Sequence, residues 1–160
     1  MTKTECSCPK CIKLCRHAPG WMMPEEARKA IAAGFAEKLM LDYWIRSEGN
    51  IYILGPAVRG CEANRAPNTD ELFGDLPMFA AMLNGPPAKG VCTFFKENKC
   101  SIHTSGFKPR QCREVYGCNP QVGPGNTEMG LEWDNPEAQK LVREWMALVG
   151  LEERILMECT

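Results

Sequence analysis

The sequence predicts a mainly α-helical fold with a small irregular β portion, in a single cysteine-rich domain that spans residues 1–160. Two observations carry this prediction. A chain of 160 residues with 44% hydrophobic content suits one globular domain that buries a sizeable core. The apolar stretches with helical period also have helix start and stop signals, whereas the stretches that could form strands are short.

Two helices are the clearest elements. Pro24, followed by two glutamates, is typical of a helix N-terminus, and Gly34 is typical of a helix end, so we expect a helix over Pro24–Ala33. An Asn-Pro-Glu sequence begins another helix at about 135–149, which Gly150 ends. The stripe that this last helix is expected to bury consists of Leu141, Trp145 and Leu148.

The other expected elements are shorter or less regular. They are a cysteine-rich loop at 6–17, a helix over Phe35–Arg46, a strand over Asn50–Leu54, a loop at 55–70, a helix within Asp70–Leu83, a chain break at 84–87, strands over Val91–Phe95 and Ser101–His103 around a turn at Glu97-Asn98, a short helix opened by Pro109, a loop at 119–130, and a helical continuation through Leu151–Met157.

Composition narrows the class of protein. The formal net charge of −1 argues against a nucleic-acid binder driven by bulk electrostatics. The N-terminal residues have no apolar run of the kind that signal peptides have, and no stretch reaches the roughly 18 apolar residues of a membrane span. We therefore expect a cytoplasmic protein that binds no membrane, in which thiols stay reduced, and a disulfide scaffold is the less favoured explanation of its ten cysteines.

The first cysteine cluster is Cys6-Ser-Cys8-Pro-Lys-Cys11-Ile-Lys-Leu-Cys15. The two-residue gap between Cys8 and Cys11 lets a tight loop direct two sulfurs at one metal, and Cys15 adds a third. Cys6 is left undecided, because a one-residue gap points side chains apart in an extended chain. Thiolates select zinc, copper(I) or iron–sulfur clusters. We expect Cys8, Cys11 and Cys15 to be metal ligands.

The second cluster consists of Cys92, Cys100, Cys112 and Cys118, which we also expect to be ligands. A hairpin turning at Glu97-Asn98 would pair Phe95 with Cys100 and Cys92 with His103, which puts Cys92 and Cys100 on opposite faces. Either the hairpin is irregular or these two cysteines serve different sites. In the second case His103 is a reserve ligand. Cys61 could complete a ligand set, and Cys159 is expected to be dispensable.

Basic residues surround both clusters, where they would stabilise thiolate, form an ordinary solvated surface, or meet a small anionic or protein partner. They are Lys3, Lys10, Lys13 and Arg16 at the first cluster, and Lys96, Lys99, Lys108, Arg110 and Arg113 at the second.

The order of these motifs resembles the CxxCxxCC family, whose members are described as zinc- or iron-chelating proteins. The resemblance covers residues 6–33 and 91–118. The family's adjacent Cys-Cys pair is Leu14-Cys15 here, its tyrosine is His103, and its arginine before proline is Lys108. Because the family includes flagellin lysine methylases, the resemblance implies a metal-dependent protein-modifying enzyme as one option. The matching segments are Cys8-Pro-Lys-Cys11, Cys15, Pro24-Glu25-Glu26, Cys92-Thr-Phe-Phe, Cys100-Ser-Ile102-His103 and Lys108-Pro109-Arg110-Gln111-Cys112-Arg113.

The sequence thus predicts a metal-binding protein with one or two iron–sulfur clusters, of the four-iron, four-sulfide type, in a redox or substrate-positioning role. The gaps of seven, eleven and five residues in the second cluster favour an iron–sulfur cluster over zinc, whose sites have short-spaced ligand pairs. A structural zinc module that presents a binding surface is the first alternative. The residues leave open whether the chain is an enzyme, because no nucleotide loop, serine elbow or HExxH motif occurs.

Overall fold

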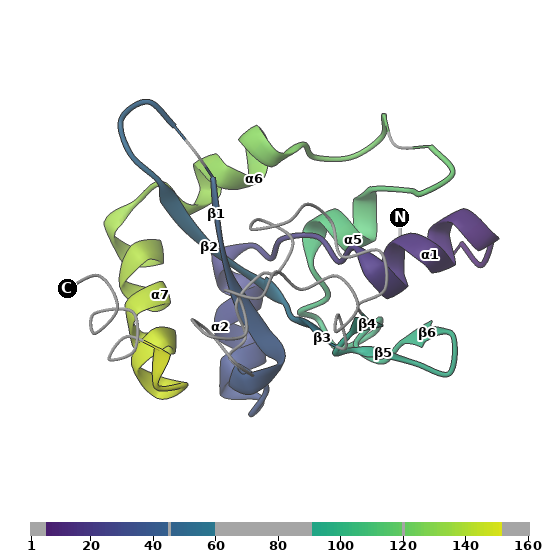
Figure 1. Ribbon diagram of the computed structural model, residues 1–160, viewed down its shortest axis with the longest axis horizontal. Helices are drawn as coiled ribbons and strands as arrows, with labels where there is room; N and C mark the ends of the chain where they lie inside the picture. The colour runs from purple at the N-terminus through teal and green to yellow at the C-terminus, as the bar shows by residue number, and fades with distance from the viewer. Residues whose placement is uncertain (1–5, 45, 60–90, 120, 152–160) are drawn as a thin grey trace, which may run out of the picture.

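The computed structural model describes residues 6–44, 46–59, 91–119 and 121–151 (Figure 1). Within these residues no helix has the length and apolar character needed to cross a membrane. The elements in chain order are α1 (Pro9–His17), α2 (Pro24–Ala32), the 3-10 helix η1 (Ala36–Lys38), β1 (Leu39–Trp44), β2 (Ile51–Pro56), β3 (Val58–Arg59), β4 (Val91–Cys92), β5 (Phe95–Lys96), β6 (Lys99–Cys100), α5 (Arg110–Glu114), α6 (Asn126–Trp133) and α7 (Pro136–Leu148).

The predicted mainly α fold is wrong, because the described residues form a mixed α/β structure. Their helices are combined with antiparallel two-stranded sheets, β1–β2, β3–β4 and β5–β6. The main error is the helix expected over Phe35–Arg46. That segment forms η1 and then β1, which pairs with β2 from Leu39↔Pro56 to Trp44↔Ile51. A short apolar run fits either a strand or a helix, and here pairing with the next segment of the chain, β2, decides for the strand.

The β1–β2 hairpin lies at the centre of the main core, with α2, α6 and α7 packed against it (Figure 1). Two fully buried tryptophans tie helices to this core by their indole N–H groups. Trp133 donates to the carbonyl oxygen of Met22 at 2.8 Å, and Trp145 donates to that of Ala36 at 2.8 Å. A buried Trp needs such an acceptor, so these bonds fix where α6 and α7 dock.

The start and stop signals of α2 and α7 are confirmed. Gly34, which follows α2, has a φ of 89°, and Gly150, which follows α7, has a φ of 71°, a left-handed conformation that favours glycine. The Asn135 side chain caps α7 by accepting from the Ala138 backbone N–H at 2.9 Å. The predicted buried stripe is wrong at Leu148, which is 64% exposed. Leu141 and Trp145 are buried as predicted.

Two helices lie where loops were expected. In the predicted cysteine loop 6–17, Cys8 is the N-cap of α1 and Pro9 begins the helix, a position where proline is favoured. This helix is polar on most of its surface and has cysteines where apolar residues would normally stand. The sequence therefore lacks the apolar helical period by which a helix is predicted. In the expected loop 119–130, Gly125 is the N-cap of α6.

The turn at Glu97-Asn98 is confirmed, since both residues have positive φ, at 49° and 61°, and join β5 to β6 in a tight hairpin. The predicted pair Phe95↔Cys100 is also present. The predicted pairing of Cys92 with His103 is wrong, because Cys92 pairs with Val58 in a different sheet. The expected strand Ser101–His103 is a turn. The elements predicted within 70–83, 84–87 and 152–157, and the side chains of Cys61 and Cys159, lie outside the described residues.

Candidate metal centre

Four thiols meet at one place in the structure, and we call them the first thiol group: Cys6, Cys8, Cys11 and Cys118. Their Sγ atoms all lie within 4.8 Å of one another. Cys118 Sγ is 3.6 Å from that of Cys11 and 4.0 Å from that of Cys6. Cys11 is buried, Cys6 and Cys8 are half-buried and Cys118 is exposed, so the group lies at the surface with one side closed. Such a set of soft ligands can bind a metal.

The local structure explains how these sulfurs converge. Cys8 precedes α1 and Cys11 lies in its first turn, so the two-residue gap brings both sulfurs to the same end of the helix. Cys118 comes from a tight turn closed by a hydrogen bond from Asn119 N to the Tyr116 carbonyl oxygen, at 3.1 Å. This turn approaches α1 closely because Gly117 has no side chain. A Cβ there would lie 2.7 Å from the Lys10 carbonyl carbon.

The first thiol group ionises in steps. Burial of Cys11 opposes its ionisation, but a hydrogen bond from the Cys118 backbone and bonds from the neighbouring thiols outweigh burial and lower the pKa of Cys11 to about 7. Cys118 is the partner that keeps its proton, because its bond to Cys11 raises its own pKa to about 12. The group therefore offers one ready thiolate near neutral pH, and a bound cation would displace the remaining protons.

A second thiol group consists of Cys15, Cys92, Cys100 and Cys112, which line one small cavity together. They come from α1, β4, β6 and α5, and α1 packs against both β4 and β6 (Figure 1). Burial raises the pKa of Cys92 to about 12, and the charges of Cys100 and Cys15 add to this. Burial likewise raises the pKa of Cys112, with further repulsion from the other three thiols. Buried Cys92 and half-buried Cys112 are thus each close enough to the other thiols of the group for the charges of those thiols to affect their pKa values.

The structure groups the thiols differently from the sequence clusters. Cys15, expected beside Cys8 and Cys11, lies with the thiols of segment 91–118, and Cys118 lies with Cys11. Cys11 and Cys15 are one helical turn apart, about 6 Å along the axis, which is enough to direct them at different groups. Cys6, left undecided by the sequence, is in the first group. Since Cys92 and Cys100 belong to different sheets, the irregular-hairpin alternative is the one observed, and both face one cavity.

His103 is in neither thiol group. Its Nδ1 atom lies 2.8 Å from the Nζ atom of Lys108, which is buried. Lys108 lines the cavity of the second thiol group, while His103 does not. Apart from its place in a basic stretch, Lys108 has no local sequence pattern that indicates burial.

The chain between α1 and α2 connects the thiols to the main core. Gly20 N donates to Cys112 Sγ at 3.1 Å, and Trp21 N donates to the Gln111 side chain at 2.7 Å. The indole N–H of Trp21 then donates to buried Asp42 at 2.6 Å, on β1. Burial raises the pKa of Asp42, although the hydrogen bonds that it accepts oppose this. This segment therefore fixes α5, and with it Cys112, against the hairpin.

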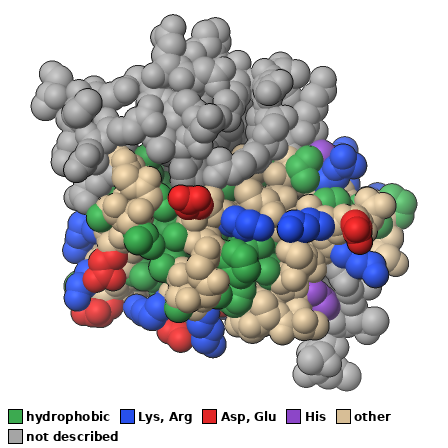
Figure 2. Space-filling view, turned by 90° about the horizontal axis from the view of Figure 1, so that it is seen from below, with side chains coloured by type: hydrophobic (Ala, Val, Ile, Leu, Met, Phe, Trp, Pro, Cys, Tyr) green, Lys and Arg blue, Asp and Glu red, His purple; other side chains and the backbone are tan. Residues whose placement is uncertain are grey.

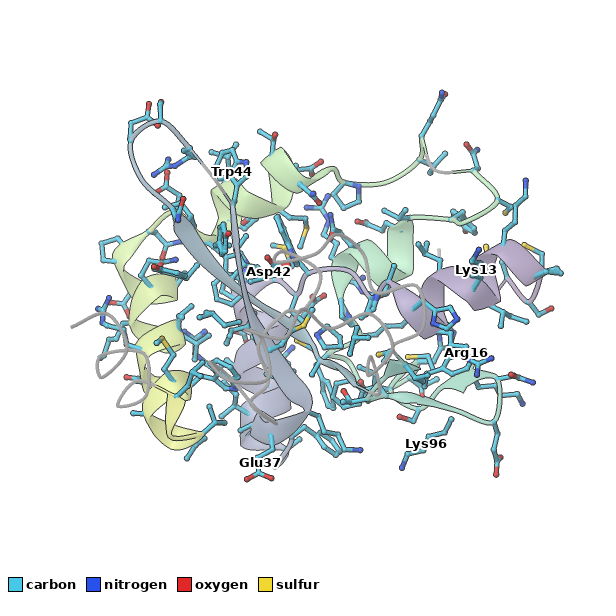
Figure 3. All side chains as sticks on the ribbon, viewed as in Figure 1. Lys13, Arg16, Glu37, Asp42, Trp44 and Lys96 are labelled. Carbon is cyan, nitrogen blue, oxygen red and sulfur yellow. The ribbon has the colours of Figure 1, made fainter. Side chains whose placement is uncertain are left out.

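A larger cavity of about 690 Å³ lies between the thiols and β1. Thiols of both groups line it, as do Asp42 and Trp44, which Figure 3 labels on β1. Its volume is in the range typical of small-molecule sites. The cavity is lined by Cys6, Cys11, Cys15, Cys112, Trp21, Asp42, Tyr43, Trp44, Gln111 and Asn126, among others.

The basic residues near the thiols divide into two kinds. Those of α1 are exposed, and Figure 3 labels Lys13 and Arg16 among them. Those of α5 are in ion pairs, because Arg110 binds Glu114 and Glu128, and Arg113 binds Glu26. Figure 2 shows lysine and arginine side chains in a row across one face of the molecule, with acids nearby. Lys96 and Lys99 of the β5–β6 hairpin are exposed as well, so among the described residues the basic surface consists of the α1 residues and these two lysines.

Comparisons of the chain with protein-family models, curated proteins and solved structures find no significant match. The candidate site therefore rests on its own geometry: four convergent thiols whose arrangement can hold a metal ion.

Proposed function

We propose that this chain is a metal-binding protein in which the first thiol group, Cys6, Cys8, Cys11 and Cys118, holds a single tetrahedral ion, with zinc the preferred metal. The observation that carries the proposal is the spacing of the sulfurs. A tetrahedral ion with metal–sulfur bonds of about 2.3 Å separates its thiolates by about 3.8 Å. The separations of 3.6 and 4.0 Å at Cys118, and the limit of 4.8 Å for the whole group, agree with this value.

The same spacing argues against a four-iron cluster at this group. In such a cluster each thiolate binds a different iron, so the sulfurs stand farther apart than around one ion. A single iron atom with four thiolates would have the geometry of the zinc site, and it is the competing occupant. The iron–sulfur expectation from the sequence is therefore not proposed for these four cysteines.

The ion has a structural role in this proposal. It joins the start of α1 to the turn that holds Cys118, two segments separated by 107 residues in the pair Cys11–Cys118. Because metal binding contributes directly to folding in small thiolate sites, the ion would stabilise the packing of α1 on segment 91–118. The exposed basic residues of α1, Lys10, Lys13 and Arg16, support an acidic protein surface as the partner. The order of cysteine motifs supports a relationship to the CxxCxxCC proteins.

Metal analysis of two variants tests this proposal. The protein is purified with zinc present, and bound zinc is measured in wild type, Cys118→Ser and the matched control Cys100→Ser. We expect one zinc at the first thiol group, its loss in Cys118→Ser, and its retention in Cys100→Ser. Cobalt substitution gives a second readout, since intense thiolate-to-cobalt absorption should vanish in the same variant. Zinc retained by Cys118→Ser, or lost only from Cys100→Ser, would contradict the proposal.

The 690 Å³ cavity favours a second candidate function, the binding of a small molecule beside the metal. Asp42 supplies a buried carboxylate and Trp44 an aromatic face at this cavity. A thermal-shift screen of small metabolites against zinc-loaded wild type and Asp42→Asn tests it, because a ligand stabilises the state that binds it. A compound that raises the melting temperature of wild type more than that of Asp42→Asn supports this function. No shift with any compound at millimolar concentration argues against it.

A further inference from the structure

We propose that the second thiol group, Cys15, Cys92, Cys100 and Cys112, holds an iron–sulfur cluster, as a centre separate from the ion at the first thiol group. The two groups share no cysteine, so this proposal goes beyond the zinc site and can fail independently of it.

The first argument is convergence. The four thiols come from four elements, α1, β4, β6 and α5, and they line one cavity. Apart from Lys108, the rest of the lining consists of apolar side chains, which are Pro19, Pro56, Phe94, Phe95, Ile102 and Pro109. A single thiol packs in an apolar core as a small hydrophobic group, whereas four thiols that converge from four elements form a set of soft ligands of the kind that binds clusters.

The second argument is spacing. Among the described residues, the first thiol group is the set of three or more potential ligands whose donor atoms all lie within 4.8 Å of one another. No three thiols of the second group meet that condition, so they stand wider apart than the roughly 3.8 Å around a single tetrahedral ion. A cluster has several irons, each with its own thiolates, and it bridges such distances with inorganic sulfide. A thiol group more open than the first is therefore better suited to a cluster than to a single tetrahedral ion.

The third argument is a buried cation at the same cavity. Lys108 is only 5% exposed and lines the pocket with the four thiols. Its Nζ atom contacts His103 Nδ1, which can accept a hydrogen bond only when that nitrogen carries no proton. A buried ammonium group needs a compensating negative charge. Lys108 also lines the larger cavity, where Asp42 supplies a carboxylate, but the cavity of the second thiol group has none among its described lining residues. A thiolate-bound cluster carries negative charge and would supply it on this side of Lys108.

The backbone adds one further contact of the right kind. Gly20 N donates a hydrogen bond of 3.1 Å to Cys112 Sγ. Hydrogen bonds to ligand sulfurs stabilise the reduced, more negative state of iron–sulfur clusters and tune their potentials. The cavity has room for little more than one water molecule, so the four thiols would have to move apart around a cluster, which would then lie against the apolar walls. The number of irons is decided by stoichiometry in the test below.

The test is anaerobic reconstitution of the full chain with ferrous iron and sulfide, in the presence of zinc. We expect a brown protein with absorption near about 400 nm, and iron and sulfide in equal amounts. Cys112→Ser and Cys100→Ser should each lose at least nine-tenths of this absorption while they keep zinc. Cys118→Ser should lose zinc and keep the colour. Cys100 is half-buried at the end of β6, so its variant tolerates the change better than one at buried Cys92.

A charge variant gives a readout that misfolding cannot imitate. Lys108→Met removes the buried cation and keeps an unbranched apolar side chain, so the cluster should still form but with a more negative reduction potential. The control is Lys96→Met, because Lys96 is exposed on β5 and does not line the cavity (Figure 3). The reduction potential of the Lys96→Met variant should equal that of wild type. A wild-type protein that binds no iron and sulfide, that fills the second group with zinc, or whose colour depends on Cys118 rather than Cys112, overturns the proposal. So does an unchanged potential in Lys108→Met.

Discussion

The Sγ atoms of Cys11 and Cys118 lie 3.6 Å apart, although 107 residues separate the two cysteines along the chain. Cys15, one helical turn beyond Cys11, lies instead with Cys92, Cys100 and Cys112. The helix α1 therefore contributes to both thiol groups: Cys11 in its first turn faces the turn after α5, and Cys15 in its second turn faces β4, β6 and α5.

Gly117→Ala should weaken zinc binding at the first thiol group by about 10- to 100-fold, the range seen when groups that position ligands are altered. An added Cβ would meet the Lys10 backbone, 2.7 Å from its carbonyl carbon and 3.0 Å from Cys11 N, so Cys118 would be pushed away from α1. Competition with a zinc chelator measures the affinity. Gly125→Ala is the matched control, since a Cβ there meets nothing within 4 Å. Equal affinities in the two variants would show that the close approach at Gly117 does not matter.

Glu26→Gln should lower the free energy of unfolding by about 1–3 kcal/mol, because buried polar groups would lose a charged acceptor. The Glu26 carboxylate binds Arg113 Nη2 at 2.5 Å and accepts from the backbone N–H of Arg110 at 3.0 Å. It thereby joins α2 to the start of α5, the helix that carries Cys112. Urea unfolding measures the change.

The control for that prediction is Glu25→Gln on the same helix. Glu25 binds Arg28 at 3.0 Å, but its side chain is 63% exposed, so the pair contributes little. We expect a change below about 0.5 kcal/mol. A similar loss in both variants would mean that the buried link from α2 to α5 is no stronger than a surface ion pair.

Asp42→Asn should change how stability depends on pH. Burial raises the pKa of Asp42 above its ordinary value of 3.8 in the folded protein. Between the unfolded and folded pKa values the folded state holds more protons, so the free energy of unfolding falls as the pH rises through that window. The asparagine variant has no such proton, and its stability should not show this fall.

Urea unfolding of both proteins at pH values upward from about 4 measures the difference in that window. The difference between the two proteins is the relevant quantity, because loss of metal at low pH affects both. Parallel stability curves for wild type and Asp42→Asn would mean that Asp42 has its ordinary pKa in the fold.

Trp133→Phe should destabilise the protein by about 1–3 kcal/mol, since it leaves the buried Met22 carbonyl oxygen without its donor. Trp133 is fully buried, and its indole N–H donates to that oxygen at 2.8 Å. Leu131→Ala on the same helix should change the free energy of unfolding by less than about 0.5 kcal/mol, because Leu131 is 57% exposed. Equal effects in the two variants would contradict a specific role for the Trp133 hydrogen bond.

Features that depend on a few neighbouring residues could be predicted from the sequence. Pro24 and Gly34 delimit α2, Asn135 caps α7, and Glu97-Asn98 make the hairpin turn, because capping, proline geometry and positive φ act within a few residues. The concentration of thiols in two stretches also predicts metal binding, and the first thiol group is a set of four cysteines that could hold a metal ion. Metal type and role are not fixed by residue spacing.

Contacts between segments, both within the β1–β2 hairpin and over longer sequence distances, fix the remaining features. Leu39–Trp44 forms a strand because it pairs with Ile51–Pro56. A short apolar run has no strong intrinsic preference for helix or strand, so this pairing decides. Cys15 lies in the second thiol group and Cys118 in the first, which is the reverse of their grouping along the sequence. Because α1 is a helix that rises about 6 Å over four residues, the sulfurs of Cys11 and Cys15 lie at different heights along it. Lys108 lines the cavity of the second thiol group because α1, β4, β6 and α5 pack together there. No local sequence pattern encodes contacts between segments so far apart in the chain.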